Sequence, residues 1–104
     1  PHFFLAFNNL VSNAVNYTPN HGMIEIQAVA ENGKIRINVY NTSIQIPENE
    51  RATLFTPFAR TSFSKSKSTG TGLGLYIVRK IAEAHGGYAE HSATPTGNVF
   101  SIVI

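Results

Sequence analysis

Apolar side chains recur at helical spacing near the start of the chain. They stand at Phe3, Phe7, Leu10, Ala14 and Tyr17. This spacing is typical of a stripe buried along one side of a helix, so we expect a helix over residues 2–18. Residues 18–22 contain a proline and a glycine and are expected to end this helix and turn the chain.

Strands are indicated where apolar and polar residues alternate. Two such stretches cover residues 24–30 and 35–39, and the Asn32-Gly33 pair between them is a strong hairpin signal. Two more strands are expected near residues 88–93 and 99–104, around a turn at residues 94–97.

Two further helices are expected between the hairpins. Pro47 can begin a short helix that runs to about Leu54. A third helix follows the glycines at residues 70–74 and ends at Gly86-Gly87. The order of elements predicts an α+β fold, a two-layer α/β sandwich in which helices cover one face of a mixed β-sheet.

Composition narrows the classes of function. The 104 residues are 42% hydrophobic and 13% charged, as expected for one globular domain over residues 1–104. The net charge of +2, spread over scattered cations, argues against nucleic acid as a partner. The chain has no Cys, which excludes disulfides and thiolate metal sites. It opens on a helical pattern without Met, so we interpret it as a domain of a longer protein.

Asparagines are unusually frequent in the first predicted helix, although they are poor helix formers. Asn9, Asn13 and Asn16 stand at positions i, i+4 and i+7 and therefore share one face. Their carboxamide oxygens can bind a hard cation such as Mg²⁺ or order its waters. A polar helix face bonded to solvent explains the same pattern, and the residues alone leave both readings open.

A glycine-rich stretch, Ser68-Thr-Gly-Thr-Gly-Leu-Gly-Leu75, leads into the third predicted helix. Glycines at a helix start leave backbone N–H groups free to bind a phosphate, which the helix dipole also favours. The stretch has no preceding strand and no Gly-Lys-Ser/Thr sequence, so it is neither a dinucleotide-binding fingerprint nor a P-loop. A flexible hinge with a helix cap remains the alternative.

The residues before these glycines, 61–69, are mainly Ser, Thr and Lys and predict a loop. Phe55 and Phe58 flank the loop on one side. Arg60, Lys65 and Lys67 can reach a triphosphate if the segment closes as a lid. A solvated loop with incidental charges is the alternative.

Taken in order, these motifs resemble the Bergerat (GHKL) ATP-binding fold in its sensor histidine kinase branch. Residues 9–18 resemble the N box of that family, and residues 46–47 and 54–60 resemble the end of its G1 box and its F box. Residues 70–87 resemble the G2 box and the helix that follows it. The resemblance covers nearly the whole chain.

The resemblance implies a set of nucleotide-binding residues. Asn13 corresponds to the Mg²⁺ ligand and Asn9 to a helper at the metal and phosphates, so these two carry the catalytic roles. Tyr17 corresponds to a residue beside the adenine or ribose. The full implied set is Asn9, Asn13, Asn16, Tyr17, Asn41, Ile46, Phe58, Arg60, Lys65, Lys67, Gly70, Thr71, Gly72, Leu73, Gly74 and Leu75.

The chain departs from the family pattern in the G1 box. Asn41 stands where an Asp usually accepts a hydrogen bond from the adenine amino group, and it can still accept through its carbonyl oxygen. Ser43 and Gln45 replace two glycines, which is expected to crowd the backbone near the base. Asn16 stands where Lys or Arg is common.

The function implied is that of a histidine kinase catalytic domain. Such a domain binds Mg²⁺-ATP and donates the γ-phosphoryl group to a histidine on a separate phosphoacceptor (dimerisation) domain. A response regulator then receives the group, in a two-component system. By the same resemblance the full protein is a homodimer and a plasma-membrane sensor, with this domain in the cytoplasm and touching neither membrane nor nucleic acid.

Two other functions remain as alternatives. The altered G1 box suggests a degenerate nucleotide-binding or pseudokinase module. A gyrase-like or chaperone ATPase is disfavoured because such enzymes use a Glu at the position of Asn9, and a carboxamide is no general base.

The histidines show no metal-site spacing. His2 is expected in the first helical turn and His85 at the end of the third helix, while His21 and His91 are expected at the surface.

Overall fold

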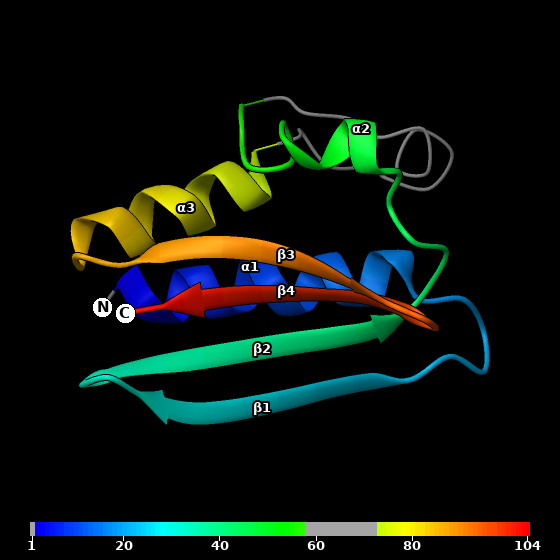
Figure 1. Ribbon diagram of the computed structural model, residues 1–104, viewed down its shortest axis with the longest axis horizontal. Helices are drawn as coiled ribbons and strands as arrows, with labels where there is room; N and C mark the ends of the chain where they lie inside the picture. The colour runs from blue at the N-terminus through cyan, green and yellow to red at the C-terminus, as the bar shows by residue number, and fades with distance from the viewer. Residues whose placement is uncertain (1, 58–72) are drawn as a thin grey trace.

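The computed structural model describes residues 2–57 and 73–104. In these ranges the elements follow the predicted order (Figure 1). They are α1 (His2–Tyr17), β1 (Ile24–Glu31), β2 (Lys34–Thr42), α2 (Glu48–Arg51), α3 (Gly74–Ala84), β3 (Tyr88–Thr94) and β4 (Gly97–Val103). The α2 helix is shorter than the expected range 47–54, because residues 52–55 form turns.

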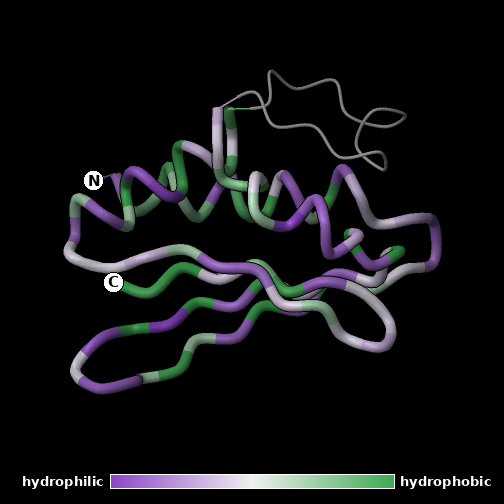
Figure 2. The backbone as a smooth tube through the Cα atoms, turned by 45° about the horizontal axis from the view of Figure 1, so that its top comes forward, coloured by the Kyte–Doolittle hydropathy of each residue, from purple (hydrophilic) through white to green (hydrophobic). Residues whose placement is uncertain are grey.

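The predicted two-layer sandwich is confirmed. The strands form a sheet in the order β1-β2-β4-β3, and α1 and α3 lie together on one of its faces, as the tilted view of Figure 2 shows. All three strand pairs are antiparallel, so the described part of the sheet is not mixed. The reason is that β1–β2 and β3–β4 are hairpins, and the second strands of the two hairpins also run in opposite directions.

The α1 helix buries a narrower stripe than the sequence indicated. Ala6, Leu10 and Ala14 are 0% exposed, whereas Phe3 and Phe7 are only partly buried beside them. The α1 helix contacts both α3 and β2. The short side chains of Ala6 and Ala14 therefore face the narrow space between α1 and its neighbours α3 and β2. The larger rings of Phe3 and Phe7 pack at the edge of this space.

The α3 helix ends where the sequence predicted. The Gly87 N–H donates to the Ala82 carbonyl (2.8 Å) and the Gly86 N–H to the Glu83 carbonyl (3.0 Å), which together form a Schellman motif. The chain then enters β3 directly, so α3 is held against β3 and β4. None of the described helices is long and apolar enough to cross a bilayer.

The β1 strand lies at the edge of the sheet, beyond the region that α1 and α3 cover (Figure 1). Its Ile26 pairs with Val39 of β2. Val39 is 0% exposed, whereas Ile26 is 48% exposed. The core therefore lies above β2 and β4 and only approaches β1.

We expect Leu10→Ala to lower the free energy of unfolding by about 2–5 kcal/mol, because it leaves a cavity at a fully buried position. Urea denaturation followed by circular dichroism measures the change. The matched control is Val15→Ala on the same helix, where the side chain is 59% exposed. An equal loss of stability in the two variants would contradict the assigned burial face of α1.

Candidate functional site

The asparagine face of α1 meets the first turn of α3. The Asn9 Nδ2 donates to the Leu5 carbonyl (2.9 Å), and this bond orients the side chain. A Cβ atom added at Gly74 would lie only 3.1 Å from the Asn9 Oδ1. Glycine at residue 74 thus allows the start of α3 to come close to the Asn9 carboxamide.

The N-terminus of α3 provides hydrogen-bond donors beside Asn9. The first turn is closed by a bond from the Ile77 N–H to the Leu73 carbonyl (2.9 Å). The N–H groups of residues 74–76 come earlier and have no acceptor within the helix. The helix dipole adds partial positive charge at the same place. Of the predicted site residues, Gly74 and Leu75 therefore contribute N–H groups at a helix end that favours an anion, and Leu73 precedes them as the N-cap residue.

The other α1 residues of the predicted set differ in exposure. Asn13 is half-buried, and its Nδ2 is buried with no hydrogen-bond partner among the described residues. Asn16 is exposed and Tyr17 is half-buried. Only Asn9 and Asn13 therefore combine the predicted face with partial burial.

Two further carboxamides lie on the helix-facing side of the sheet, near the end where β2 stops. Asn41 of β2 is 1% exposed and Asn98 of β4 is 2% exposed, and the two residues pair directly in register. The Asn41 Oδ1 has no hydrogen-bond partner among the described residues. It is therefore a buried acceptor whose hydrogen bond no described residue supplies.

The segment after β2 is tied to the β3–β4 turn. The Ser43 N–H donates to the Thr96 carbonyl (3.2 Å), and the Gln45 side chain donates to the Thr94 carbonyl. Gly97 begins β4 directly after this turn, and a Cβ atom there would be 2.0 Å from the Asn41 carbonyl oxygen. Ser43 and Gln45, which stand where the family has glycines, thus form hydrogen bonds to the β3–β4 turn. The close approach of two backbones occurs at Gly97, whose missing side chain leaves room for the Asn41 carbonyl oxygen.

Asn98 bonds to the same segment, and sequence reasoning missed it. Its Nδ2 donates to the Ile44 carbonyl (2.9 Å) and its Oδ1 accepts from the Ile46 N–H (3.2 Å). The sequence gives little signal for this role, because a single Asn in a strand has no periodic pattern. Ile46, which the sequence analysis did predict at the site, is 6% exposed.

The expectation that His91 lies at the surface is wrong. It pairs with Phe100 on the helix-facing side of the sheet and is half-buried, with the two ring centroids 5.1 Å apart. Its Nε2–H donates to the Asn98 Oδ1 (2.7 Å). Burial lowers the pKa of His91, the bond to Asn98 acts in the opposite direction, and the charge of Arg51 lowers the pKa further. Side chains alternate between the two faces along β3, and this alternation places residue 91 on the inner face. The prediction relied instead on the polarity of His, which favours the surface.

Some predicted residues lie outside the described residues. They are Phe58, Arg60, Lys65, Lys67, Gly70, Thr71 and Gly72. Phe55, which flanks them, is partly buried against the core, and its ring meets that of Phe100 edge-on at 6.4 Å between centroids.

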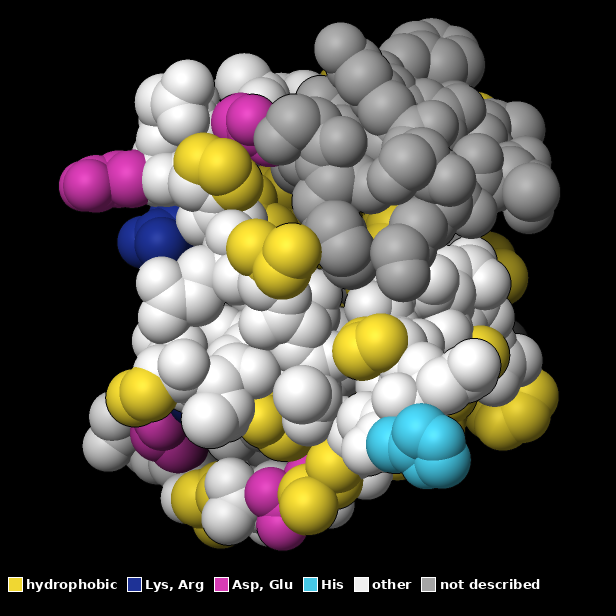
Figure 3. All heavy atoms as spheres, turned by 90° about the vertical axis from the view of Figure 1, so that its right-hand side faces the viewer, with side chains coloured by type: hydrophobic (Ala, Val, Ile, Leu, Met, Phe, Trp, Pro, Cys, Tyr) yellow, Lys and Arg dark blue, Asp and Glu magenta, His cyan; other side chains and the backbone are white. Residues whose placement is uncertain are grey.

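The described residues of the predicted site carry no charged side chain, and Arg51 lies at its edge, where it bonds to the Ile46 carbonyl. In Figure 3, which faces the end of the sheet where β2 stops, the described surface shows little of the blue that marks Lys and Arg. No group of three or more His, Cys, Asp or Glu suited to a metal occurs among the described residues. The oxygen donors here are carboxamides rather than carboxylates.

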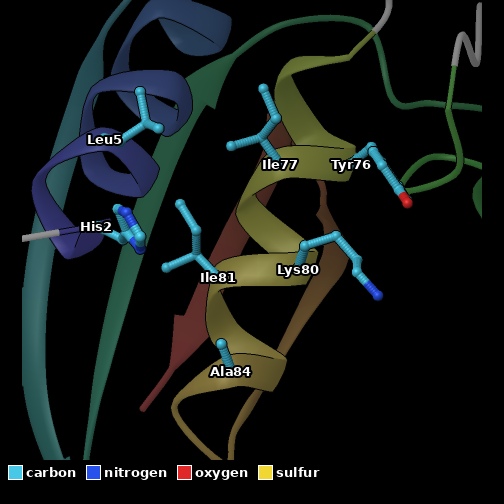
Figure 4. A pocket seen from close by; sticks show the side chains of 7 residues that line it. All are labelled: His2, Leu5, Tyr76, Ile77, Lys80, Ile81 and Ala84. Carbon is cyan, nitrogen blue, oxygen red and sulfur yellow. The ribbon is translucent and has the colours of Figure 1, made fainter.

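A separate hollow of about 410 Å³ lies between the first turns of α1 and the α3 helix. It is lined by His2, Leu5, Tyr76, Ile77, Lys80, Ile81 and Ala84. Figure 4 shows Leu5, Ile77 and Ile81 pointing into the space between the two helices, while Lys80 points away from α1. Among the predicted site residues that the structure describes, none lines this hollow, so it is distinct from the place where Asn9 meets Gly74.

Comparisons with known proteins agree with this architecture. Residues 1–104 match the family described as histidine kinase-, DNA gyrase B- and HSP90-like ATPase. The sensor-like histidine kinase SenX3 of Mycolicibacterium smegmatis is 38% identical over 101 residues, covering 95% of this chain and 26% of SenX3. The circadian input-output histidine kinase CikA of Synechococcus elongatus is 36% identical over 98 residues, covering 92% of this chain and 13% of CikA.

Solved structures give the same result. A nucleotide-free catalytic domain of the histidine kinase ThkA superposes with a TM-score of 0.84 at 36% identity, covering 99% of this chain and 65% of that one. Full-length ShkA in complex with AMPPNP superposes with a TM-score of 0.83 at 27% identity, covering 98% of this chain and 21% of that one.

The fold and the order of its elements define a catalytic domain of the histidine kinase type. The chain belongs to the family of histidine kinase-, DNA gyrase B- and HSP90-like ATPases. Within that family it is similar to the catalytic ATP-binding domains of sensor histidine kinases in two-component systems, as the resemblance implied. The chain spans about a quarter or less of the curated relatives SenX3 (26%) and CikA (13%).

We expect the stability of the domain to fall as the pH drops below about 6.5, the ordinary pKa of His. Because the folded-state pKa of His91 is lowered, the unfolded chain binds the proton first, and the free energy of unfolding decreases between the two pKa values. Above this pH range, neutral His91 makes its full contribution to the free energy of unfolding. Urea denaturation at a series of pH values measures it.

His91→Gln is expected to flatten this dependence, since Gln does not titrate and can still donate a hydrogen bond to Asn98. His2→Gln, at an exposed position, is the matched control. A pH profile equally flattened by both substitutions would contradict the role of His91.

Proposed function

We propose that this domain binds Mg²⁺-ATP and donates the γ-phosphoryl group to a histidine on a separate phosphoacceptor domain. The observation that supports this best is the contact between Asn9 and Gly74. It brings a carboxamide oxygen to the N-terminus of α3, where N–H groups without an acceptor inside the helix and the helix dipole attract phosphate. Family membership supports the nucleotide class.

The described residues fit a Mg²⁺ ion that is shared with phosphates. Mg²⁺ prefers oxygen ligands and usually keeps several waters, with few ligands from the protein. Asn13, whose carboxamide has a buried nitrogen without a described partner, would present its oxygen to the ion, and Asn9 would hold a phosphate or a bound water. The ion, when bound, would neutralise negative charge on the triphosphate. The described residues of the predicted site carry no charged side chain that could do so.

The base would lie at the end of the sheet. Asn41 Oδ1, a buried acceptor without a described partner, would accept a hydrogen bond from the adenine amino group. Ile46 would cover the base with apolar surface, and Tyr17 would lie near the adenine or ribose. These assignments follow the resemblance and are supported by the burial of Asn41 and Ile46.

Phosphoryl transfer here depends on positioning and charge neutralisation. A nitrogen of the acceptor imidazole attacks the γ-phosphorus, the bond to the β-phosphate oxygen breaks, ADP leaves and the imidazole loses its proton. The α3 N-terminus, together with the predicted Gly70, Gly72 and the cations Arg60, Lys65 and Lys67, would hold the phosphates in line.

The partners are proposed on the same basis. The histidine kinase ThkA has been solved in complex with the response regulator TrrA, and that ThkA chain superposes with a TM-score of 0.75 at 35% identity, covering 95% of this chain and 27% of that one. We infer that the parent protein also passes its phosphoryl group to a response regulator. Its homodimeric state and its place as a membrane sensor with this domain in the cytoplasm remain predictions.

A degenerate nucleotide-binding module is the second candidate. It is favoured by one observation, the replacement of the G1 carboxylate and glycines by Asn41, Ser43 and Gln45. The ATPase alternative is disfavoured because Asn9 offers no general base.

We expect calorimetric titration to show Mg²⁺-dependent ATP binding that Asn13→Ala weakens by about tenfold or more, or about 1.4 kcal/mol. Asn8→Ala, at an exposed position on the same helix, is the matched control and should bind as the parent does. Equal ATP binding by the two variants would contradict the placement of the Mg²⁺ ion at α1.

Phosphotransfer distinguishes the kinase from the degenerate module. The domain is fused in place of the catalytic domain of ThkA and incubated with radiolabelled Mg²⁺-ATP. We expect label on the acceptor histidine, stable in alkali and lost in acid. ATP binding without label on the acceptor would favour the degenerate module.

A further inference from the structure

The β1 strand has one open side. It comes first in the strand order β1-β2-β4-β3 and pairs with β2 alone among the described residues (Figure 1). The Thr42 N–H donates to the Met23 carbonyl (2.9 Å), and bonding to one neighbour alternates along an antiparallel strand. The odd-numbered residues of β1 therefore bond to β2. The N–H and C=O groups that point to the open side belong to Ile24, Ile26, Ala28 and Ala30.

The side chains of these four residues make the open side apolar as well. Ile26 pairs with Val39 of β2, which is 0% exposed, so the even-numbered residues of β1 lie on the helix-facing side of the sheet. The α1 and α3 helices do not extend over them, and Ile24 and Ile26 are 36% and 48% exposed. A further strand at this edge would bond to the backbone and shield part of these side chains from water.

This edge lacks the usual protection against pairing with another strand. Protected edges carry Pro, Lys, a bulge or charges that point inward. The eight residues of β1 include no Pro and no Lys, and the register with β2 is unbroken from Ile24 to Glu31. The two carboxylates of β1, Glu25 and Glu31, are odd-numbered and lie on the face away from the helices. Neither of them blocks the edge by pointing inward.

A second copy of β1 fits this edge when it lies antiparallel to the first. A two-fold axis through Gln27 sets even-numbered residues opposite one another, so they exchange hydrogen bonds across the new pair. Each outward N–H and C=O of the four residues then has a partner. Large side chains also meet small ones. The helix-facing pairs are Ile24 with Ala30 and Ile26 with Ala28 of the other copy.

The two carboxylates favour this register over the next one along the strand. With the axis at Gln27, Glu25 lies opposite Val29 of the other copy, and no carboxylate faces another. With the axis at Ala28, Glu25 would lie opposite Glu31. Like charges directly opposite each other destabilise a strand pair.

We propose that this chain associates with a second copy of itself through β1, in an antiparallel pair centred on Gln27. The two four-stranded sheets then form one continuous sheet. The interface is isologous, because each copy uses the same surface.

This association leaves the candidate nucleotide site open. Asn41 lies beside Ile24, at the first residue of β1. Because the two copies of β1 are antiparallel, the two sites lie at opposite ends of the shared strand pair. The inference is therefore independent of the proposed function, and neither fails with the other.

Cysteine substitution tests the pairing and its register, because the chain has no Cys of its own. Gln27→Cys sets two cysteines opposite each other in a non-hydrogen-bonded pair, with Cα atoms about 4.5 Å apart, within the range of a disulfide. The matched control is Glu25→Cys. Its two cysteines would be about 13 Å apart along the strands, too far for a disulfide. Both positions are exposed.

We expect Gln27→Cys to form a disulfide-linked dimer in a glutathione redox buffer at least about tenfold faster than Glu25→Cys, as measured by non-reducing electrophoresis. Sedimentation equilibrium of the unchanged chain should show monomer and dimer, with a dissociation constant on the order of 10–100 µM for so small an interface. Equal cross-linking of the two variants, or a chain that stays monomeric at about 1 mM, would overturn the inference. A monomer would point to another segment of the parent protein as the occupant of the edge.

Charge substitutions at Val29 test the same register without cysteine. Val29→Lys sets an ammonium opposite Glu25 of the other copy and is expected to tighten association by about fivefold, whereas Val29→Glu should weaken it by a similar factor. Within one copy Val29 pairs with Arg36, so Glu is the substitution that favours the fold. The effect on folding thus opposes the effect on association. Dissociation constants that change in the same direction in both variants, or in neither, would contradict the register.

Discussion

The close contact of α1 with both α3 and the sheet is the constraint on which the rest of the structure depends. Ala6, Leu10 and Ala14 are 0% exposed, and the two alanines leave room for neighbours on two sides. A larger residue at either position would push α3 or the sheet away. The same contact brings Gly74 to Asn9, so the geometry of the site follows directly from core packing on one helix.

The end of the sheet at Asn41 and Asn98 contains a buried polar atom that lowers the stability of the fold. A buried polar atom without a partner costs about 1–3 kcal/mol, and Asn41 Oδ1 is such an atom among the described residues. Asn98, its neighbour in register, has its carboxamide fully engaged. The Asn98 carboxamide thus stabilises the fold, while the Asn41 oxygen has no described hydrogen-bond partner. This arrangement is expected where a ligand supplies the missing hydrogen bond.

The fold could be predicted from local patterns, because hairpins and helix ends depend on neighbouring residues. The Asn32-Gly33 turn joins β1 and β2, and Gly86 ends α3 as expected. The site could be predicted only in part. Asn9 and Asn13 follow from helical spacing, but Asn98 acts on residues 52 and 54 positions away. Such contacts are set by the order of strands in the sheet, which single-sequence periodicity does not contain.

The replacement of a G1 carboxylate by Asn41 also changes how the site responds to pH. A carboxylate can lose its charge in acid, whereas a carboxamide does not titrate, so the base recognition proposed for Asn41 is itself independent of pH. His91 is then the group with a lowered pKa that bonds to the segment through Asn98. Its Nε2–H is a donor in both protonation states, so the bond to Asn98 survives protonation. The cost of protonating His91 therefore falls on the buried Nδ1 and on fold stability, while the position of residues 44–46 is preserved as long as the domain stays folded.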